Sequence, residues 1–365
     1  MGDGRFAQSQ PNGRMALAIL AAALALGVAA CGPDSNSNKA TPTATASPIP
    51  PPGTGYLFVA NGSGPNVLTF KATANGDVAP TAILKSTSVF SQPEGVVIDQ
   101  LGDILVGDEG AQSLLTFPYA VSGVRDIPPT TAIAGLKAGA IALDAFGNIY
   151  VVDEAPSETG GGSVVVISAG STTQSCTISY SGFVDPEGIA IDSSTENIWV
   201  SDVGTTPPTI FEFPAVSGGC PTTPIATLSG ASTTMQYPYA VTFDTTGNLW
   251  VADAGSYAAT VGPDQVLEFS SSSLTGSGNI DVAPQNTITG AATKLNGPEG
   301  IAIGPGDETI VTNDGAGAST SSITTYASAA TGNAAPIRTI AGSKTGLNEP
   351  EQVWFFAPSV APIRP

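Results

Sequence analysis

The chain has 365 residues, only 11% of them charged, and a formal net charge of −19 at pH 7. It contains no histidine, which excludes a Ser-His-Asp triad, a Cys-His pair and imidazole-ligated zinc or haem. No Lys or Arg occurs between Lys137 and Lys294, so this long stretch cannot neutralise a phosphate backbone. We therefore expect no nucleic-acid partner. The acidity favours either a cationic ligand or simple solubility.

The first segment is an apolar run over residues 15–30, preceded by Arg5 and Arg14 and ending at Cys31. This pattern is typical of an export signal, and the run is shorter than a comfortable membrane span. The end of the run, Val-Ala-Ala-Cys, resembles the lipobox of bacterial lipoproteins. The resemblance implies that the signal peptide, residues 1–30, is removed and that Cys31 is lipidated. It predicts anchoring to the bacterial cell envelope, at the inner or the outer membrane. The alternative is a plain secretory signal with a chance cysteine.

Residues 31–54 are rich in Pro, Thr, Ser and Asn and have almost nothing to bury. This composition predicts a disordered, partly extended tether between the anchor and the folded part. The folded part is expected over residues 55–357, followed by a C-terminal tail, residues 358–365.

The folded part repeats a pair of strand patterns. Residues 93–99 read Pro-Glu-Gly-Val-Val-Ile-Asp, and residues 102–108 read Gly-Asp-Ile-Leu-Val-Gly-Asp. The apolar run predicts a buried strand, Asp with Gly predicts a tight hairpin, and the second run predicts the next strand. Similar pairs begin at residues 138, 186, 238 and 298, and a sixth first strand begins at residue 350.

Two weaker strand patterns follow each pair, and four antiparallel strands in a unit of this length make a propeller blade. The sixth unit stops after its first strand. Patterns at residues 56–61, 66–70 and 81–84 match the missing strands. The sequence therefore predicts an all-β protein, a six-bladed β-propeller of four-stranded antiparallel blades, closed by N-terminal strands that complete the last blade. A seventh blade would require a degenerate unit.

This repeat pattern is similar to NHL repeats and to the gluconolactonase/regucalcin-like propellers, and the resemblance covers nearly all of residues 55–357. In such propellers the second residue of each first strand faces the central channel. The six residues at this position are Glu94, Gly139, Glu187, Tyr239, Glu299 and Glu351.

Acidic or amide residues at this position ligate a divalent metal in gluconolactonase-like relatives. The resemblance implies a metal site, with Ca²⁺ or another divalent cation, at Glu94, Glu187, Glu299 and Glu351. This chain departs from those enzymes, which mix Glu, Asn and Asp, because it offers only Glu. The alternative is that the four residues are solvated channel residues.

Three further groups of residues have two interpretations each. Tyr239 and Trp354 either stack on a ligand near the channel or pack in the fold. Cys176 and Cys220 either form a disulfide in an exported protein or stay as free thiols. The aspartates that end the repeated strands, such as Asp108 and Asp153, fit turn-bonding better than acid–base chemistry.

We expect a non-enzymatic, membrane-anchored propeller that binds an envelope protein, a glycan or a small cationic ligand. No catalytic residue is predicted, since the related NHL-like lyases rely on histidine. The alternative is a divalent-metal-dependent hydrolase or lactonase with a carboxylate-lined channel. Tight one-to-one calcium binding that is lost on Glu187→Gln/Glu299→Gln would favour the hydrolase. Absence of binding would exclude the metal site and leave a propeller that binds an envelope partner.

Overall fold

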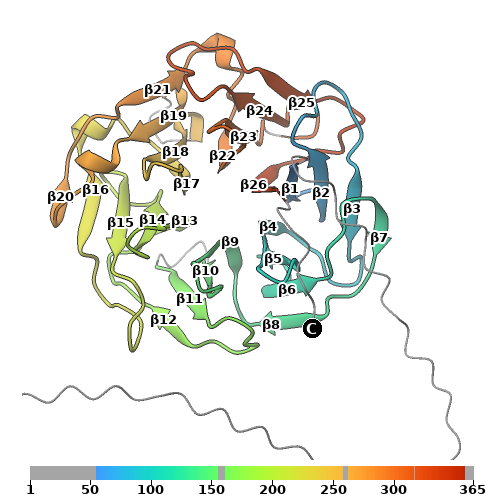
Figure 1. Ribbon diagram of the computed structural model, residues 1–365, viewed down its shortest axis with the longest axis horizontal. Coiled ribbons are helices and arrows are strands. Elements are labelled where there is room, and N and C mark those ends of the chain that lie inside the picture. Colours follow the sequence, from blue (N-terminus) through green and yellow to red (C-terminus); the bar gives the residue numbers. More distant parts are fainter. Residues whose placement is uncertain (1–54, 155–160, 258–261, 316, 358–365) are drawn as a thin grey trace, which may run out of the picture. The chain divides into compact units, whose positions relative to one another are not determined.

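The computed structural model of the protein describes residues 55–154, 161–257, 262–315 and 317–357. The predicted signal peptide, Cys31, the tether and the C-terminal tail lie outside the described residues. Within them, six sheets of mostly antiparallel strands form a ring, and the regular helices are single 3₁₀ turns. The predicted six-bladed β-propeller is confirmed (Figure 1). None of the described helices is long and apolar enough to cross a membrane.

In blades II and III the strands follow one another in chain order from the channel outwards. Blade I closes the ring, and its innermost strand is the last strand of the described chain. Blade I consists of β26 (Pro350–Phe356), β1 (Tyr56–Asn61), β2 (Asn66–Lys71) and β3 (Ala82–Lys85). Blade II consists of β4 (Pro93–Ile98), β5 (Ile104–Asp108), β6 (Ser113–Phe117) and β8 (Thr131–Ala134). Blade III consists of β9 (Ala138–Leu143), β10 (Ile149–Asp153), β11 (Ser163–Ile167) and β12 (Cys176–Ile178).

Blades IV to VI follow the same plan. Blade IV consists of β13 (Pro186–Ile191), β14 (Ile198–Asp202), β15 (Thr209–Phe213) and β16 (Ala226–Ser229). Blade V consists of β17 (Pro238–Phe243), β18 (Leu249–Ala254), β19 (Asp264–Phe269) and β21 (Asn286–Thr289). Blade VI consists of β22 (Pro298–Ile303), β23 (Thr309–Asn313), β24 (Ser322–Tyr326) and β25 (Arg338–Ala341). The 3₁₀ turns are η1 (Ala231–Thr233), η2 (Gly255–Tyr257), η3 (Ser271–Ser273) and η4 (Ala291–Thr293).

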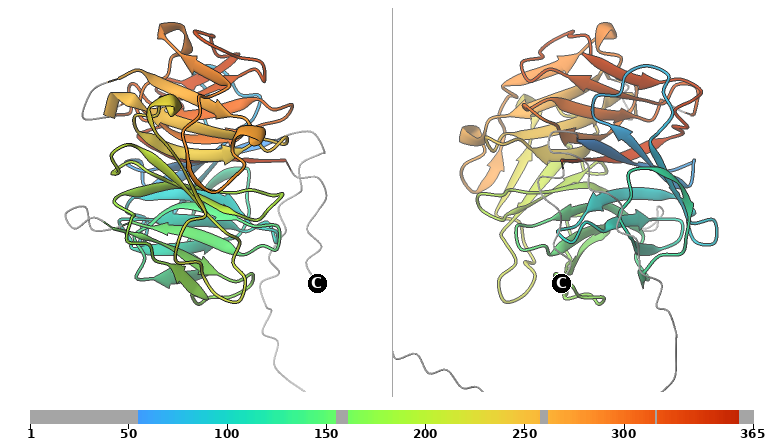
Figure 2. Two further views of the ribbon diagram at one scale, coloured as in Figure 1. Left: turned by 90° about the vertical axis from the view of Figure 1, so that its left-hand side faces the viewer. Right: turned by 45° about the vertical axis from the view of Figure 1, so that its right-hand side comes forward.

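The inner strands β26, β4, β9, β13, β17 and β22 surround the centre of the ring, and the blades are seen edge-on in Figure 2. Apolar side chains on facing blades interdigitate to form the core. Trp199 of blade IV, for example, is 2% exposed and meets the ring of Phe243 of blade V at 5.9 Å between centroids. Burial of such faces is the main stabilising contribution, at about 25 cal/mol per Å² of apolar surface.

The ring closes where the two ends of the described chain meet. Strand β1 pairs antiparallel with both β2 and β26, and Tyr56 lies opposite Phe356. The fully buried Phe58 lies opposite Trp354, and its ring contacts the rings of Tyr119 and Phe356. The predicted closure by N-terminal strands is confirmed. It removes the open edges that an incomplete blade would leave on either side of the seam.

A second set of contacts ties the outer parts of neighbouring blades together. The connection between the third and fourth strands of a blade reaches back to the outermost strand of the preceding blade. In blades II and V this connection forms a short parallel strand, β7 (Gly123–Asp126) against β3 and β20 (Gly278–Ile280) against β16. In blades I and VI it forms single bridges, Gly76 to Ile340 and Gly332 to Ile288.

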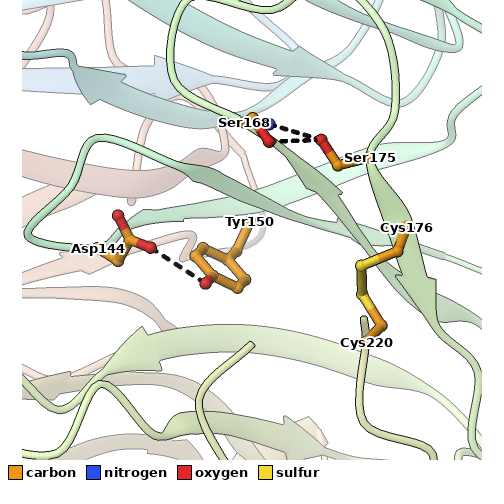
Figure 3. Close-up of a disulfide and its surroundings, with 6 residues drawn as sticks. All are labelled: Asp144, Tyr150, Ser168, Ser175, Cys176 and Cys220. Carbon is orange, nitrogen blue, oxygen red and sulfur yellow. Dashed lines mark hydrogen bonds between the residues drawn. A yellow bond between two sulfur atoms is a disulfide. The ribbon is translucent and has the colours of Figure 1, made fainter. Parts of the chain in front are cut away.

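In blade IV the same connection is tied covalently to the preceding blade. Cys220 lies between β15 and β16 and forms a disulfide with Cys176 in β12 of blade III, with a Cα–Cα distance of 5.7 Å (Figure 3). Among the described residues, no strand pairing or disulfide of this kind joins blade III to β8 of blade II. The disulfide thus takes the place that short strands take elsewhere in the ring.

We expect the double variant Cys176→Ser/Cys220→Ser to lose about 2–4 kcal/mol of unfolding free energy, because the cross-link constrains the unfolded chain. The two cysteines are separated by 44 positions, long enough for a substantial loop-closure effect. Urea unfolding of the oxidised protein and the variant measures the difference, with dithiothreitol added to each as a control. Equal stability of the two proteins would contradict the expectation.

Candidate functional site

The predicted channel-facing residues meet at one end of the central channel. Glu94, Glu187, Tyr239, Glu299 and Glu351 line a cavity of about 30 Å³, together with one residue that the repeat did not predict, Glu154. Each of the first five stands second in an inner strand, where the chain enters the sheet next to the channel. Five inner strands therefore direct four carboxyl groups and one phenol at one small space, and the residue after β10 adds a fifth carboxyl group.

Glu154 occupies the place that Gly139 leaves open. Gly139 is the inner-strand residue of blade III, and a Cβ atom there would overlap the Oε1 atom of Glu154. Glu154 itself follows β10, directly after Asp153. The sequence contained a signal for this residue, because Glu109 stands at the same point of blade II, after Asp108. The repeated strand patterns end at the aspartates, so they did not predict a role for the next position.

Gln352 lines the acidic cavity and reaches from blade I to the inner strands of blades II and III. The same position is glycine in blades II, IV and VI, as Gly95, Gly188 and Gly300, where a side chain would collide with the backbone or side chains of the next blade. In blade I the Oε1 atom of Gln352 accepts the amides of Val96 and Ile141, at 3.0 and 3.1 Å. Its Nε2 atom donates to the carbonyl of Ile141 at 2.8 Å. The side chain thus links blade I to blades II and III.

The carboxyl groups at the cavity resist ionisation. Burial raises the pKa of Glu154 and of Glu299 to about 8, and the neighbouring charges of Glu187 and Asp314 respectively add to this effect. Burial and like-charged neighbours hold the pKa of the other three well above the usual range. Those three are Glu94, Glu187 and Glu351. The Oε2 atom of Glu299 is buried and has no hydrogen-bond partner. Such a cluster is stabilised either by protons or by a cation.

One subset of carboxylates is close enough to share an ion. Oxygen atoms of Glu94, Glu109 and Glu154 lie within 4.8 Å of one another. Among the described residues, Glu94 is the one member of the predicted set of four that takes part in such a group. Glu109 also forms an ion pair with Lys137. Burial alone would raise the pKa of Glu109, but the hydrogen bonds with Lys137 and Glu94 and the charge of Lys137 together lower it.

These residues fit a hard divalent cation such as Ca²⁺. Calcium takes six to eight oxygen ligands, and three carboxylates supply up to six oxygens, with the rest from water. The raised pKa values, caused first by burial and then by neighbouring carboxylates, and the unpaired oxygen of Glu299 fit a site that gains stability from a further positive charge. Glu94, Glu109 and Glu154 would hold the ion, which would supply charge compensation there.

The repeated aspartates bond to the backbone. Asp108 accepts the amides of Ser91 and Gln92, and Asp202 accepts those of Val184 and Asp185. Both therefore hold the segment that leads into an inner strand, as the turn-bonding interpretation expects.

The two predicted aromatic residues lie at different cavities. Tyr239 lines the acidic cavity, and Trp354 lines a second cavity, which Gln352 also lines.

Comparisons with solved structures agree on the fold. A chain of a nidogen/laminin complex is 15% identical, with a TM-score of 0.53, and the match covers 84% of this chain and 99% of that one. A protein of unknown function from Bacteroides caccae is 11% identical, with a TM-score of 0.54, covering 82% and 98%. A chain of the hydrazine synthase of Kuenenia stuttgartiensis is 15% identical, with a TM-score of 0.50, covering 73% and 72%. At these identities the likeness shows the fold alone.

No protein-family model matches the chain, and no curated protein matches it in sequence. Membership in the NHL-repeat or regucalcin-like families therefore stays a prediction. What stands is a six-bladed propeller, a fold compatible with binding a ligand or a protein.

Proposed function

We propose that this protein is a non-enzymatic binding propeller of the bacterial cell envelope that takes a divalent cation at the acidic end of its channel. The observation that carries the proposal is the convergence of five glutamates on a cavity of about 30 Å³. Lys137 forms an ion pair with Glu109 and so compensates part of the negative charge of the glutamates at one side of the cavity. A divalent cation would replace the protons that the glutamates otherwise retain at neutral pH.

The size of the cavity favours binding over hydrolysis. A water molecule needs about 10–15 Å³ of such space, so the cavity takes an ion with one or two waters. A lactone or ester would need a larger space beside the ion than this cavity provides. The metal-dependent hydrolase or lactonase is therefore the weaker of the two functions.

The envelope location rests on the sequence of residues 1–54. The apolar run before Cys31 and the Pro/Thr-rich tether support a lipid-anchored protein whose propeller stands off the membrane. Metabolic labelling with a palmitate analogue, comparing the natural chain with Cys31→Ser, tests the anchor separately from the cation site.

Calcium titration by calorimetry tests the cation site. The chain from residue 32 onwards retains every described strand, including β1 and β26 that close the ring, and is stripped with EDTA beforehand. We expect one Ca²⁺ per chain at pH 7.5. Because the glutamates release protons on binding, the measured heat should differ between Tris and HEPES buffers.

The matched variants are Glu154→Gln at the cavity and Glu268→Gln in β19, whose side chain accepts a hydrogen bond from Asn248 away from the channel. Glu154→Gln should weaken Ca²⁺ binding at least tenfold, and Glu268→Gln should leave it unchanged. Absence of binding by the natural chain, or equal binding by both variants, would overturn the cation site.

A further inference from the structure

A second and larger cavity lies in the channel at the other side of Gln352. Its volume is about 260 Å³, and Gln352 lines both this cavity and the acidic one. We call it the apolar chamber. Its wall includes large apolar residues at the ends of five inner strands, namely Leu143, Ile191, Phe243, Ile303 and Phe355, together with Trp354.

The wall residues are half-buried, although they belong to the innermost strands of the ring. Protein interiors are normally packed to the density of organic crystals, with few voids larger than a water molecule. The volume of the apolar chamber approaches the 300 Å³ or so at which small-molecule pockets begin. The side chains of five blades thus enclose apolar space that they do not fill.

Asp244 and Gln352 at the chamber have hydrogen-bond partners for their side chains, whereas the indole Nε1 atom of Trp354 is buried without one. Asp244, the acidic residue of the chamber, accepts hydrogen bonds from Thr246, Asn248 and the indole of Trp250. The amide of Gln352 is bonded on both its oxygen and its nitrogen atom. Among these side chains a charged ligand would find only the indole N–H of Trp354 as a partner, and it would lose most of its hydration. An uncharged apolar ligand has no ionic hydration to lose, and burial of its apolar surface favours binding.

We propose that the apolar chamber binds an uncharged, predominantly apolar small molecule, about the size of a two-ring aromatic compound. The site is distinct from the cation site and does not rest on it, because none of the glutamates at the acidic cavity lines the chamber. The ligand enters at the face where the described chain begins and ends, since Tyr56 pairs with Phe356 next to the wall residue Phe355.

Fluorescence titration with N-phenyl-1-naphthylamine, an uncharged two-ring probe, tests the proposal on the chain from residue 32 onwards. We expect saturable one-to-one binding. Ile303→Lys and Ile191→Lys each place a charge in the chamber from a different blade, and each folded variant should bind the probe at least tenfold more weakly. Ile337→Lys is the matched control, because Ile337 is 46% exposed and is not part of the wall.

Several outcomes would overturn the proposal. One is absence of saturable binding by the natural chain. Another is equal weakening by Ile303→Lys and Ile337→Lys. Stronger probe binding after deletion of residues 358–365 would show that the chain's own tail occupies the chamber. Glu154→Gln should leave probe binding unchanged, so a failed calcium titration does not decide this experiment.

Discussion

In the absence of divalent cations, the free energy of unfolding is expected to fall as the pH rises from about 4.5 to about 8. The pKa values of Glu154 and Glu299 are raised from 4.5 to about 8 in the folded protein. Their stabilising contribution is thus complete below the unfolded value and is lost as the pH approaches the folded one. Each unit of raised pKa corresponds to about 1.4 kcal/mol, so a loss of several kcal/mol is expected. Urea unfolding in EDTA at pH 4.5, 6 and 8 measures it.

Replacement of Glu154 or Glu299 by a neutral side chain should reduce the change of the unfolding free energy with pH. Glu299→Gln removes an ionisable group from the cavity, whereas Asp281→Asn changes an exposed carboxylate and should leave the slope as it is. Added Ca²⁺ should restore stability at pH 8, because a bound ion stabilises the ionised glutamates. Stability that stays constant or rises over this pH range would contradict the expectation.

Truncation of the buried side chain at the ring closure should have the second large effect. Phe58→Ala is expected to cost about 3–5 kcal/mol of unfolding free energy, the usual range for a buried phenylalanine. Phe58 is 0% exposed, lies opposite Trp354 and packs on Tyr119 and Phe356. It therefore joins the first and last strands of the chain to blade II. Urea unfolding with circular dichroism measures the loss.

The matched control is Phe146→Ala, because Phe146 is 73% exposed in the turn between β9 and β10. Its truncation should change stability by less than about 0.5 kcal/mol. Hydrogen exchange gives a second measurement, since loosening of β1 should speed exchange in its partner β26 before the other inner strands. Similar losses for Phe58→Ala and Phe146→Ala would show that the closure contributes little.

The repeats were sufficient to predict the fold and part of the acidic cavity. Each blade carries its own alternation of apolar strands and Asp-Gly turns, which are short-range signals. The unfinished sixth unit and the unmatched strands near residue 56 predicted the closure, because strands with open edges need partners. The common position of Glu94, Glu187, Glu299 and Glu351 in their blades predicted that they meet, and the structure places all four at the cavity.

Gly139 and Gln352 differ from the residues at the same positions in the other repeats. The contacts that result from these differences cannot be predicted from the sequence of one repeat. The absence of a Cβ at Gly139 admits Glu154, and Gln352 reaches across to blades II and III. Both effects depend on distances between inner strands of different blades. The pairing of Cys176 with Cys220 likewise follows from the way one blade's outer connection reaches the preceding blade.

The sequence by itself thus determined the number of blades, the closure and the ring of glutamates, because these follow from periodicity along the chain. Only the tertiary structure decided which carboxylates approach one another, which blades Gln352 links and that a second, larger cavity lies in the channel. The physical reason is that side chains from six blades share one axis. The volume left between them depends on the size of every side chain around the ring, and a local sequence pattern does not predict that volume.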